Sequence, residues 1–342
     1  MKYKLQLLAA LGVLVLGNAL ANAEISIELT TVGDAGNAND STGYGAVSYV
    51  YNIATKEVNL FQYTAFLNAV AATDTFSLYN TQLASDSSIA GISRSGSSGS
   101  YTYSVLGSGN RPVTYVSWFD ATRFANWMAN GQPTGAQGNA TTENGAYTLT
   151  GAPGPGPTKN TVNPNTGAAT TYWIPSESEW YKAAYYQPVA QGGDTDSYWL
   201  YPTKSNSIAG NTIGVSNSAN YYDGDYARSQ NSLPGLLTDG GAYGTNSASF
   251  YGTYDQGGNV FEWYDAVFGG YRRVRGGYSA GDSSFLVSSY RYFGSPTDED
   301  LGTGFRVASV PEPSTAVMVV LTGAGWLMWR RGRVNRLSKL QA

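Results

Sequence analysis

Apolar residues recur at helical spacing in three segments of the chain, each behind a residue that can cap a helix. Asn59 precedes the first segment, Ser117 the second and Ser176 the third. Asp120 and Glu179 stand three residues after the two serines, which is the spacing of a capping box. The first segment places its apolar side chains at Leu60, Tyr63, Phe66, Leu67 and Val70. The pattern predicts three amphipathic helices that start after residues 59, 117 and 176.

Strand-like patterns are shorter and fewer. Residues 25–29 alternate between apolar and polar side chains, and residues 46–53 also favour a strand. Between the predicted helices lie stretches rich in Gly, Ser, Asn, Thr and Pro, at about 86–110, 131–170 and 187–248. Loops of this length are usually functional or held together by other means. We find no repeat and no charge-rich linker in 24–309, and we expect one loop-rich α+β domain.

The 342-residue sequence contains neither cysteine nor histidine. The absence of cysteine excludes disulfides, thiolate nucleophiles and Cys-based zinc or iron–sulfur sites. The absence of histidine excludes an imidazole general base, a Ser-His-Asp triad and a His-ligated haem. A metal site would have to be built from oxygen atoms, which favours calcium or magnesium.

The N-terminus has the pattern of a secretory signal peptide. Lys2 and Lys4 precede an apolar run at 5–16, and Ala21 and Ala23 stand at the −3 and −1 positions of a cleavage site. We therefore predict a signal peptide at 1–23 and export by the secretory pathway.

The C-terminus combines three features in a fixed order. The sequence Val-Pro-Glu-Pro-Ser, which includes Pro311, Glu312 and Pro313, is followed by an apolar stretch at 315–329 and then by a basic cluster. The stretch is marginal in length for a transmembrane helix, and the basic cluster would remain cytoplasmic. Residues 310–342 closely resemble the PEP-CTERM sorting tail of Gram-negative bacteria. The resemblance implies membrane anchoring through the tail, processing by an exosortase-type enzyme, and a final place at the cell surface or in an extracellular polysaccharide matrix.

Removal of both ends leaves a strongly acidic domain. The ends hold seven of the 20 basic residues and one of the 24 acidic residues, so 24–310 carries 13 basic and 23 acidic side chains, a net charge of −10. A domain with this negative charge cannot neutralise the phosphates of a nucleic acid. We therefore expect no nucleic-acid partner. Cations and neutral partners such as sugars are compatible with this charge.

Sequence blocks in a particular order cover nearly all of residues 44–309. They include Glu57-Val58-Asn59, Arg111-Pro112-Val113, Trp173-Ile174-Pro175-Ser176-Glu177, Gly257-Gly258-Asn259-Val260-Phe261-Glu262-Trp263, Val274-Arg275-Gly276-Gly277 and Gly304-Phe305-Arg306-Val307. Together they resemble the formylglycine-generating enzyme, or sulfatase-modifying factor, domain. The resemblance implies an irregular, loop-rich α+β fold related to C-type lectins.

The chain departs from this family at the catalytic site. Family enzymes oxidise a substrate cysteine with copper held by two cysteines, which lie between the Arg-Gly-Gly and Gly-Phe-Arg blocks. The corresponding span, 278–292, contains no thiol, and a serine hydroxyl cannot replace a thiolate as a copper(I) ligand. A second branch of the family binds iron with a His triad, which is also missing. We therefore expect no copper, iron or zinc, and we assign no catalytic residue.

Calcium is the family metal that this sequence could retain. By resemblance, one ion site would use Gly257, Gly258, Asn259, Val260 and Glu262. A second site would use Asn220, Tyr221 and Asp239. Carbonyl and carboxylate oxygens are the ligands that calcium prefers. The alternative is that Asn259 and Glu262 only hydrogen-bond a buried turn.

Several conspicuous residues are interpreted as scaffold. The resemblance implies that Arg275 and Arg306 are buried in pairs with acidic residues. A capping box explains Glu179, and the helix dipole explains Glu177. The acidic run at 298–300 is interpreted as a solvated loop. Four tryptophans are expected to pack in the core: Trp118, Trp127, Trp180 and Trp263.

Tyrosines in polar loops are the candidate ligand contacts. Tyr222 and Tyr226 stand among aspartates and glycines, and Tyr290 and Tyr292 stand near the end of the span 278–292. A tyrosine offers a flat apolar face and a hydroxyl, which suits stacking on a sugar or adaptable contact with a protein. The alternative is that these rings cover the core where regular structure is absent.

The sequence thus predicts an exported, non-catalytic binding or matrix protein for extracellular polysaccharide or a surface protein. The alternative is an enzyme that modifies exported proteins or matrix glycans, which includes the oxidase activity that the family label suggests. A closed pocket with convergent polar groups at 278–292 would favour the enzyme, and an open surface would favour the binding protein.

Overall fold

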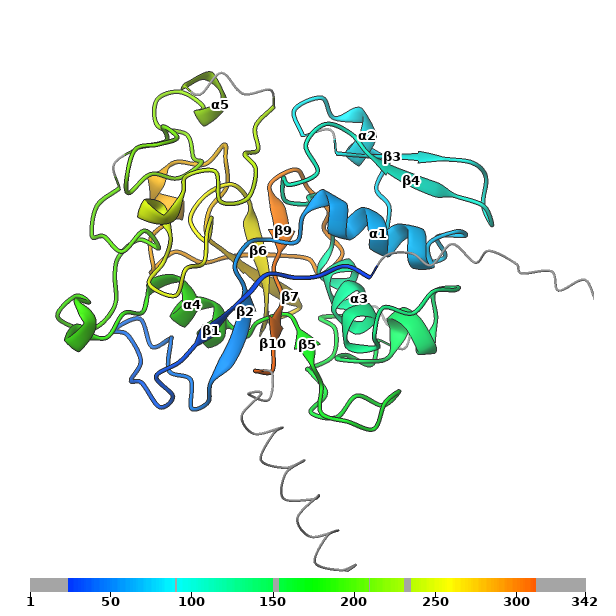
Figure 1. Cartoon of the computed structure of the whole chain (residues 1–342), viewed down its shortest axis with the longest axis horizontal. Coiled ribbons are helices and arrows are strands. Elements are labelled where there is room, and N and C mark those ends of the chain that lie inside the picture. The colour runs from blue at the N-terminus through cyan, green and yellow to red at the C-terminus, as the bar shows by residue number, and fades with distance from the viewer. Residues whose placement is uncertain (1–23, 90, 150–153, 209, 231–234, 312–342) are drawn as a thin grey trace, which may run out of the picture.

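The computed structural model describes residues 24–89, 91–149, 154–208, 210–230 and 235–311. The strands are β1 (Leu29–Val32), β2 (Tyr51–Ala54), β3 (Ile92–Ser95), β4 (Thr102–Val105), β5 (Tyr172–Trp173), β6 (Phe261–Phe268), β7 (Tyr271–Arg275), β8 (Tyr292–Gly294), β9 (Thr303–Phe305) and β10 (Ala308–Ser309). The helices are α1 (Leu60–Val70), α2 (Gln82–Ser85), α3 (Trp118–Ala129), α4 (Glu177–Tyr185) and α5 (Ala227–Gln230), with short turns η1 (Asn139–Glu143), η2 (Val189–Gln191), η3 (Thr245–Ser247) and η4 (Ser283–Phe285). Loops make up much of the rest, so the protein has the predicted loop-rich α+β fold (Figure 1).

One four-stranded sheet joins the two ends of the domain. Its order is β1-β2-β10-β5, and Ile53 of β2 lies opposite Thr30 on one side and Ala308 on the other. The predicted strand at 25–29 is wrong in its position, because pairing with β2 begins only at Leu29. Residue Ile25 is instead tied to the Gln132 side chain, which both donates to and accepts from its backbone. The alternation of apolar and polar residues at 25–29 therefore indicated an extended segment correctly. The sheet itself begins only where this segment pairs with β2.

The second sheet has the strand order β8-β7-β6-β9. The region between the Arg-Gly-Gly and Gly-Phe-Arg blocks runs from the end of β7 through β8 to β9. Strand β6 is antiparallel to β7 and parallel to β9. The register of β6 against β7 shifts between Tyr264 and Val267, which forms a bulge. Asp265 in this bulge makes an ion pair with Arg272 of β7 at 2.6 Å. The bulge therefore re-aims the outer half of the β6–β7 hairpin.

The three predicted helices are confirmed, and so are their caps. Asn59, Ser117 and Ser176 each accept a hydrogen bond from the backbone amide three residues later. Helices α1 and α3 pack their apolar faces together (Figure 1). Their aromatic side chains and one from β9 form a cluster that we call the core aromatic cluster: Tyr63, Phe66, Phe124, Trp127 and Phe305. This cluster connects both helices to the second sheet.

All three stretches predicted as loops contain short pieces of regular structure. Within 86–110, strands β3 and β4 form an antiparallel hairpin with Ile92 opposite Val105. Its strands are only four residues long and are flanked by Gly and Ser, which are typical of turns. The sequence pattern therefore indicated a loop here and not a hairpin. Within 131–170, residues 139–143 form a single π-helical turn. The third stretch, 187–248, contains only α5, η2 and η3 among its described residues.

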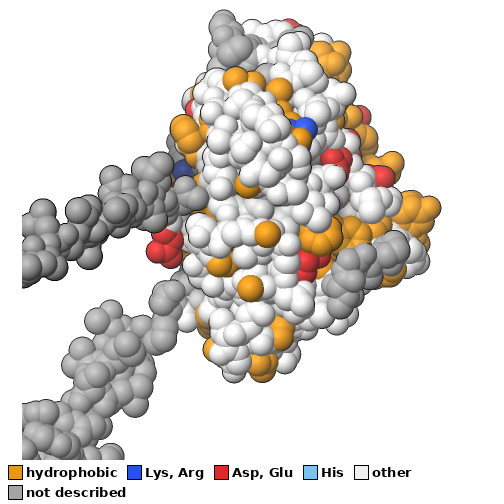
Figure 2. Space-filling view, turned by 90° about the vertical axis from the view of Figure 1, so that its right-hand side faces the viewer, with side chains coloured by type: hydrophobic (Ala, Val, Ile, Leu, Met, Phe, Trp, Pro, Cys, Tyr) orange, Lys and Arg blue, Asp and Glu red, His pale blue; other side chains and the backbone are white. Residues whose placement is uncertain are grey.

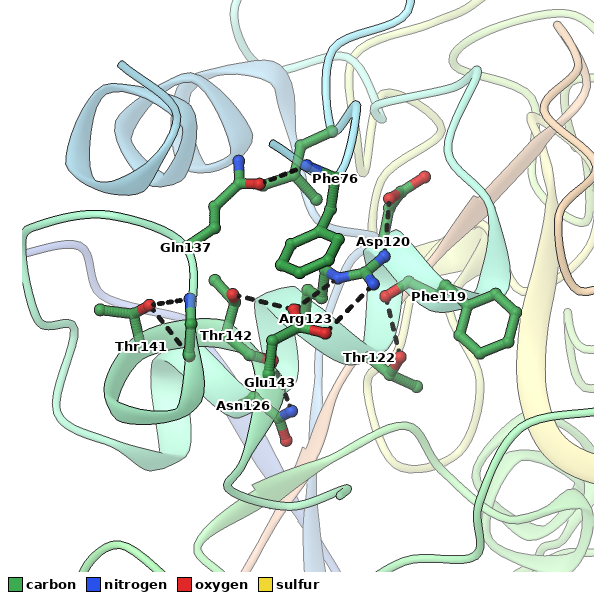
Figure 3. Close-up of polar contacts among 12 residues, drawn as sticks. Phe76, Phe119, Asp120, Thr122, Arg123, Asn126, Gln137, Thr141, Thr142 and Glu143 are labelled. Carbon is green, nitrogen blue, oxygen red and sulfur yellow. Dashed lines mark hydrogen bonds and ion pairs between the residues drawn. The ribbon is translucent and has the colours of Figure 1, made fainter. Parts of the chain in front are cut away.

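A buried arginine holds the π-helical turn against α3. Arg123 donates to both carboxylate oxygens of Glu143, at 2.8 and 3.3 Å, and its guanidinium lies 3.8 Å from Asp120 (Figure 3). The Phe76 ring stacks on this guanidinium at 4.5 Å. Removal of either partner would leave an uncompensated buried charge, so this ion pair couples the π-helical turn to α3.

The other buried arginines are paired, as the sequence predicts. Arg275 donates to Glu177 at 2.6 Å, and Arg306 donates to both oxygens of Glu262 at 2.6 Å. Glu177 therefore has an ion-pair partner in addition to its place at the start of α4. The four predicted core tryptophans, Trp118, Trp127, Trp180 and Trp263, are all buried.

Acidic and hydrophobic side chains dominate the coloured surface of the face drawn in Figure 2, where few Lys or Arg side chains appear. Hydrophobic side chains gather at one edge of this face. In the part of the chain that the structure describes, we find no helix with the length and apolar character of a membrane span. The predicted signal peptide and nearly all of the predicted sorting tail, including Glu312 and Pro313, lie outside the described residues.

Candidate ligand-binding site

A cavity of about 650 Å³ opens beside the second sheet. Strands β6, β7 and β8, the span 278–292 and the loop 298–303 all contribute to its wall. Its aromatic lining consists of Phe261, Trp263, Tyr278, Phe285, Tyr290, Tyr292 and Phe293. About half of the Tyr292 surface is exposed, so the cavity is open to solvent at this side.

Five of these rings form a group that we call the aromatic pocket: Phe261, Tyr278, Phe285, Tyr290 and Tyr292. Phe261 is nearly parallel to the three tyrosines, whereas Phe285 is nearly parallel to Tyr278 but tilted by 38° from Phe261 and 35° from Tyr290. The centroid of Phe261 lies 5.3 Å from Tyr278 and 6.3 Å from Tyr290, at interplanar angles of 25° and 23°. Tyr292 is 6.2 Å from Phe261 at 25°. Rings with a common orientation present flat faces, and they suit a ligand that is itself flat on one side.

Glycines allow the chain to bring these rings together. Gly277 has a φ of +76°, and a Cβ atom there would lie 2.7 Å from Leu286. Gly281 and Gly302 both face the Tyr278 ring, and a Cβ atom at either position would come within 3 Å of it. The Arg-Gly-Gly block is therefore required for the turn after β7, and two further glycines make room for Tyr278.

Two carboxylates complete the wall of the cavity. Asp298 accepts a hydrogen bond from the Ser295 amide at 2.7 Å. Asp300 accepts from the Gly302 amide at 2.8 Å and from the Thr303 hydroxyl at 3.1 Å. The interpretation of 298–300 as a solvated loop is confirmed for Asp298 and Asp300, which are exposed, whereas Glu299 is partly buried. The loop also lines the cavity, together with the next residue, Leu301, which the sequence analysis did not predict.

Glu299, between these two acids, points elsewhere. Its carboxylate accepts a hydrogen bond from Asn80 at 2.6 Å. Burial, followed by the charge of Asp120, raises the pKa of Glu299 to about 7. Burial raises the pKa of Asp120 to about 6. Glu299 therefore anchors the loop, while Asp298 and Asp300 remain beside the cavity.

The chemistry available in the cavity is recognition by stacking and hydrogen bonding. Aromatic faces bind apolar surfaces, and tyrosine hydroxyls and carboxylates accept or donate hydrogen bonds. Burial raises the pKa of Tyr290 above its ordinary value, so its hydroxyl is protonated at neutral pH. The chain has no thiol or imidazole to supply a nucleophile or a neutral base here.

The structure brings together only part of the predicted ligand contacts. Tyr290 and Tyr292 line the cavity. Tyr222 and Tyr226 do not; their rings pack on each other at 5.1 Å, although the Tyr222 amide donates to the Gly281 carbonyl near the pocket. The sequence analysis did not identify Phe261 as a ligand contact, because its block, 257–263, has the pattern of a buried core segment. The location of the family's catalytic span at 278–292 was the signal that could have found Tyr278 and Phe285.

The residues of the first predicted calcium site have other partners. Both Glu262 oxygens accept from Arg306, and one also accepts from Trp180 at 2.7 Å. The Asn259 side-chain oxygen accepts from Asn220 and from the Thr238 amide. In this arrangement Arg306 neutralises the only carboxylate of the site, so a calcium ion here would have to be held by carbonyl and amide oxygens.

Two of the three residues of the second predicted calcium site have protein partners, whereas the buried side-chain oxygen of Asn220 has none among the described residues. Asp239 accepts from the Ser108 hydroxyl at 2.5 Å, and the Tyr221 carbonyl accepts from Asn211 at 2.9 Å. Asn220 donates to the Leu236 carbonyl. Within the described ranges, no group of three or more acidic residues is placed to hold a metal.

One buried carboxylate near Arg306 lacks such partners. Neither oxygen of Glu57 has a hydrogen-bond partner among the described residues, although the side chain is buried. Burial, followed by the charge of Asp255, raises the pKa of Glu57 well above its ordinary value. Burial also raises the pKa of Asp255 to about 6. One guanidinium therefore faces three buried acids, and Glu262 has the direct contact.

Comparisons with known proteins agree with this architecture. Residues 40–310 match a family model described as the sulfatase-modifying factor enzyme 1-like domain. No curated protein matches the sequence. Structures that resemble the fold include CarF, at 21% identity and a TM-score of 0.47, with 84% of this chain and 99% of that chain covered. PvdO from Pseudomonas aeruginosa has 15% identity and a TM-score of 0.44, with 83% of this chain and 92% of that chain covered.

A third resemblance is to Treponema denticola variable protein 1, at 18% identity and a TM-score of 0.40, with 83% of this chain and 95% of that chain covered. These structural resemblances carry no argument about function. The family match covers most of the chain and includes the second sheet, the first sheet except β1, the three capped helices and the aromatic pocket. This protein therefore belongs to the sulfatase-modifying factor enzyme 1-like family.

Proposed function

We propose that this protein is a non-catalytic, exported binding protein that holds extracellular polysaccharide in the aromatic pocket. The observation that carries the proposal is the set of near-parallel rings beside Asp298 and Asp300 in one open cavity. A pyranose ring has an apolar face that stacks on an aromatic ring and hydroxyls that donate to carboxylates. The pocket offers both kinds of contact side by side.

The missing ligands for copper and iron support a binding role. The span 278–292 lines the position where the resemblance implies copper chemistry, and it presents aromatic rings in place of thiols. The carboxylates that this cavity offers to an enzyme of another kind are Asp298 and Asp300. Both oxygens of Asp300 already accept hydrogen bonds from the protein, which favours a positioning role over proton transfer.

The location of the protein is proposed from the sequence at its two ends. The predicted signal peptide would direct export, and the predicted tail would anchor the chain until an exosortase-type enzyme removes it. Pro311, the first residue of the motif, directly follows the exposed Val310 and lies just beyond β10. The processing site would therefore be accessible without unfolding the domain.

Binding of the full-length chain to polysaccharide from the producing organism tests the proposal. We expect saturable binding that Tyr290→Ala weakens and Tyr222→Ala leaves unchanged, because both are loop tyrosines and only Tyr290 lines the cavity. Release of new reducing ends during the incubation would instead support the enzyme. Equal binding by both variants would show that the aromatic pocket is not the polysaccharide-binding site.

A further inference from the structure

Exposed aromatic side chains continue outwards from the aromatic pocket. They come from the tip of the β6–β7 hairpin and from β8, and we call them the edge belt: Phe268, Tyr271 and Phe293. Their exposed fractions are 50%, 47% and 39%. Single exposed apolar residues are ordinary, but a contiguous group on one edge marks an interaction site.

Ring contacts connect the edge belt to the pocket. Phe293 lies 5.1 Å from Tyr271 and 5.6 Å from Phe268. On its other side Phe293 stacks on Tyr292 at 5.6 Å and 21°. Tyr292 belongs to the aromatic pocket, so the aromatic surface crosses the edge strand β8 without a break.

Phe293 belongs to both the cavity wall and the edge belt. On strand β8, Tyr292 pairs with Val274 and Phe293 pairs with Arg273, and both aromatic side chains line the cavity. The Arg273 guanidinium lies 4.0 Å above the Phe268 ring. The outer end of the surface therefore combines apolar ring faces with a positioned hydrogen-bond donor.

Glycine keeps the tip of the hairpin free of bulk. Gly269 and Gly270 connect Phe268 to Tyr271, and a Cβ atom at either glycine would meet nothing within 4 Å. Gly269 has a φ of +61°, which favours glycine in this turn. A ligand can therefore pass over the hairpin tip without a steric barrier.

We infer that the ligand is a neutral, linear glycan several sugars long, which occupies the aromatic pocket with one segment and the edge belt with the next. This inference rests on the proposed function and adds the length and charge of the ligand. A single sugar would use only the pocket and leave the connected outer rings without a role. A polyanionic chain would be repelled by the net charge of −10 on residues 24–310.

The test compares short and long fragments of the neutral fraction of the producing organism's polysaccharide, with the acidic fraction as a third probe. We measure their affinities for the full-length wild type and for Phe268→Ala/Tyr271→Ala. The double variant should bind long fragments about tenfold more weakly and short fragments unchanged. Phe268→Tyr, which keeps a ring at the tip, should bind like the wild type.

The outcomes separate the inference from the function on which it rests. If long fragments bind both proteins equally, the edge belt is not part of the site, and the pocket proposal stands. If neither neutral fragment binds the wild type, the proposed function itself fails. Tighter binding of the acidic fraction overturns the inference. Two other results would also overturn the inference if the double variant keeps its affinity for glycan. If the double variant loses a dimer that the wild type forms, the edge belt binds a second copy of the chain. If it loses binding to neutral lipid vesicles, the edge belt binds a membrane.

Discussion

The core aromatic cluster and the aromatic pocket use the same residue types with different geometry. In the core, Phe124 meets Phe66 at an interplanar angle of 80° and Phe305 at 72°. In the pocket, Phe261 meets its tyrosine neighbours at about 25°. Tyr63 and Phe124 stack at 20° even in the core, but every ring of the core cluster is buried, whereas the pocket rings line a cavity that is open to solvent. The comparison teaches that access to solvent, and not aromatic content, separates the part that stabilises the fold from the part that can bind.

Removal of a core ring should have the largest effect. Phe124→Ala deletes a buried ring that contacts four aromatic neighbours, and we expect a loss of ~3–5 kcal/mol in the free energy of unfolding. Chemical denaturation measures this loss. A loss as small as that of Phe268→Ala on the exposed belt would contradict the distinction between the two regions.

Removal of a pocket ring should change binding more than stability. Tyr292→Ala should weaken polysaccharide binding by ~2 kcal/mol, about thirtyfold, because the ring contacts both Phe261 and Phe293. Its effect on unfolding should be ~0.5 kcal/mol, since half of the side chain is already exposed. Titration calorimetry and thermal unfolding on the same sample distinguish the two effects. A variant that loses stability and binding in proportion would make Tyr292 a core residue.

The unpartnered acid Glu57 should make stability depend on pH. Its pKa in the folded protein is raised, so its favourable contribution is complete below the unfolded-state pKa of ~4.3 and is lost as the pH rises through the folded value. The wild type should therefore gain stability as the pH falls from 8 towards 5, a range that also covers Asp255 with its pKa of about 6.

Glu57→Gln removes the charge and should flatten this dependence, with a gain of ~1 kcal/mol at pH 8. Glu28→Gln is the matched control, because Glu28 is an exposed partner of Lys56. Melting temperatures across the pH range provide the measurement. An unchanged slope in Glu57→Gln would show that other acids, such as Glu299, determine the dependence.

Removal of calcium should have the smallest effect. Because Arg306 already neutralises Glu262, we expect a chelator to leave the melting temperature and the binding of polysaccharide unchanged. A lower melting temperature that added calcium restores would reinstate the ion site predicted from the sequence.

Local signals in the sequence predicted the elements that local interactions determine. The caps at Asn59, Ser117 and Ser176 are confirmed, because each cap joins residues only three positions apart. The motif resemblance further predicted paired arginines, although not that Glu262 would be the partner of Arg306. That contact joins residues 44 positions apart and depends on how β6 and β9 pair.

The pocket was predicted only in part for a similar reason. Tyr290 and Tyr292 were identified as a pair of tyrosines in a polar loop. Asp298 and Asp300 were not, because their approach to the cavity depends on the Glu299 contact with Asn80, a residue far away in the chain. The β3–β4 hairpin was missed because two four-residue strands carry little periodicity.

The most direct test of the account is a crystal structure of the protein with a neutral oligosaccharide from the producing organism's polysaccharide. We predict a sugar ring stacked on the aromatic pocket, with a hydroxyl near Asp298 or Asp300 and the chain leaving past Tyr292 towards Phe293. A sugar bound elsewhere on the surface, with the pocket empty, would contradict the central claim.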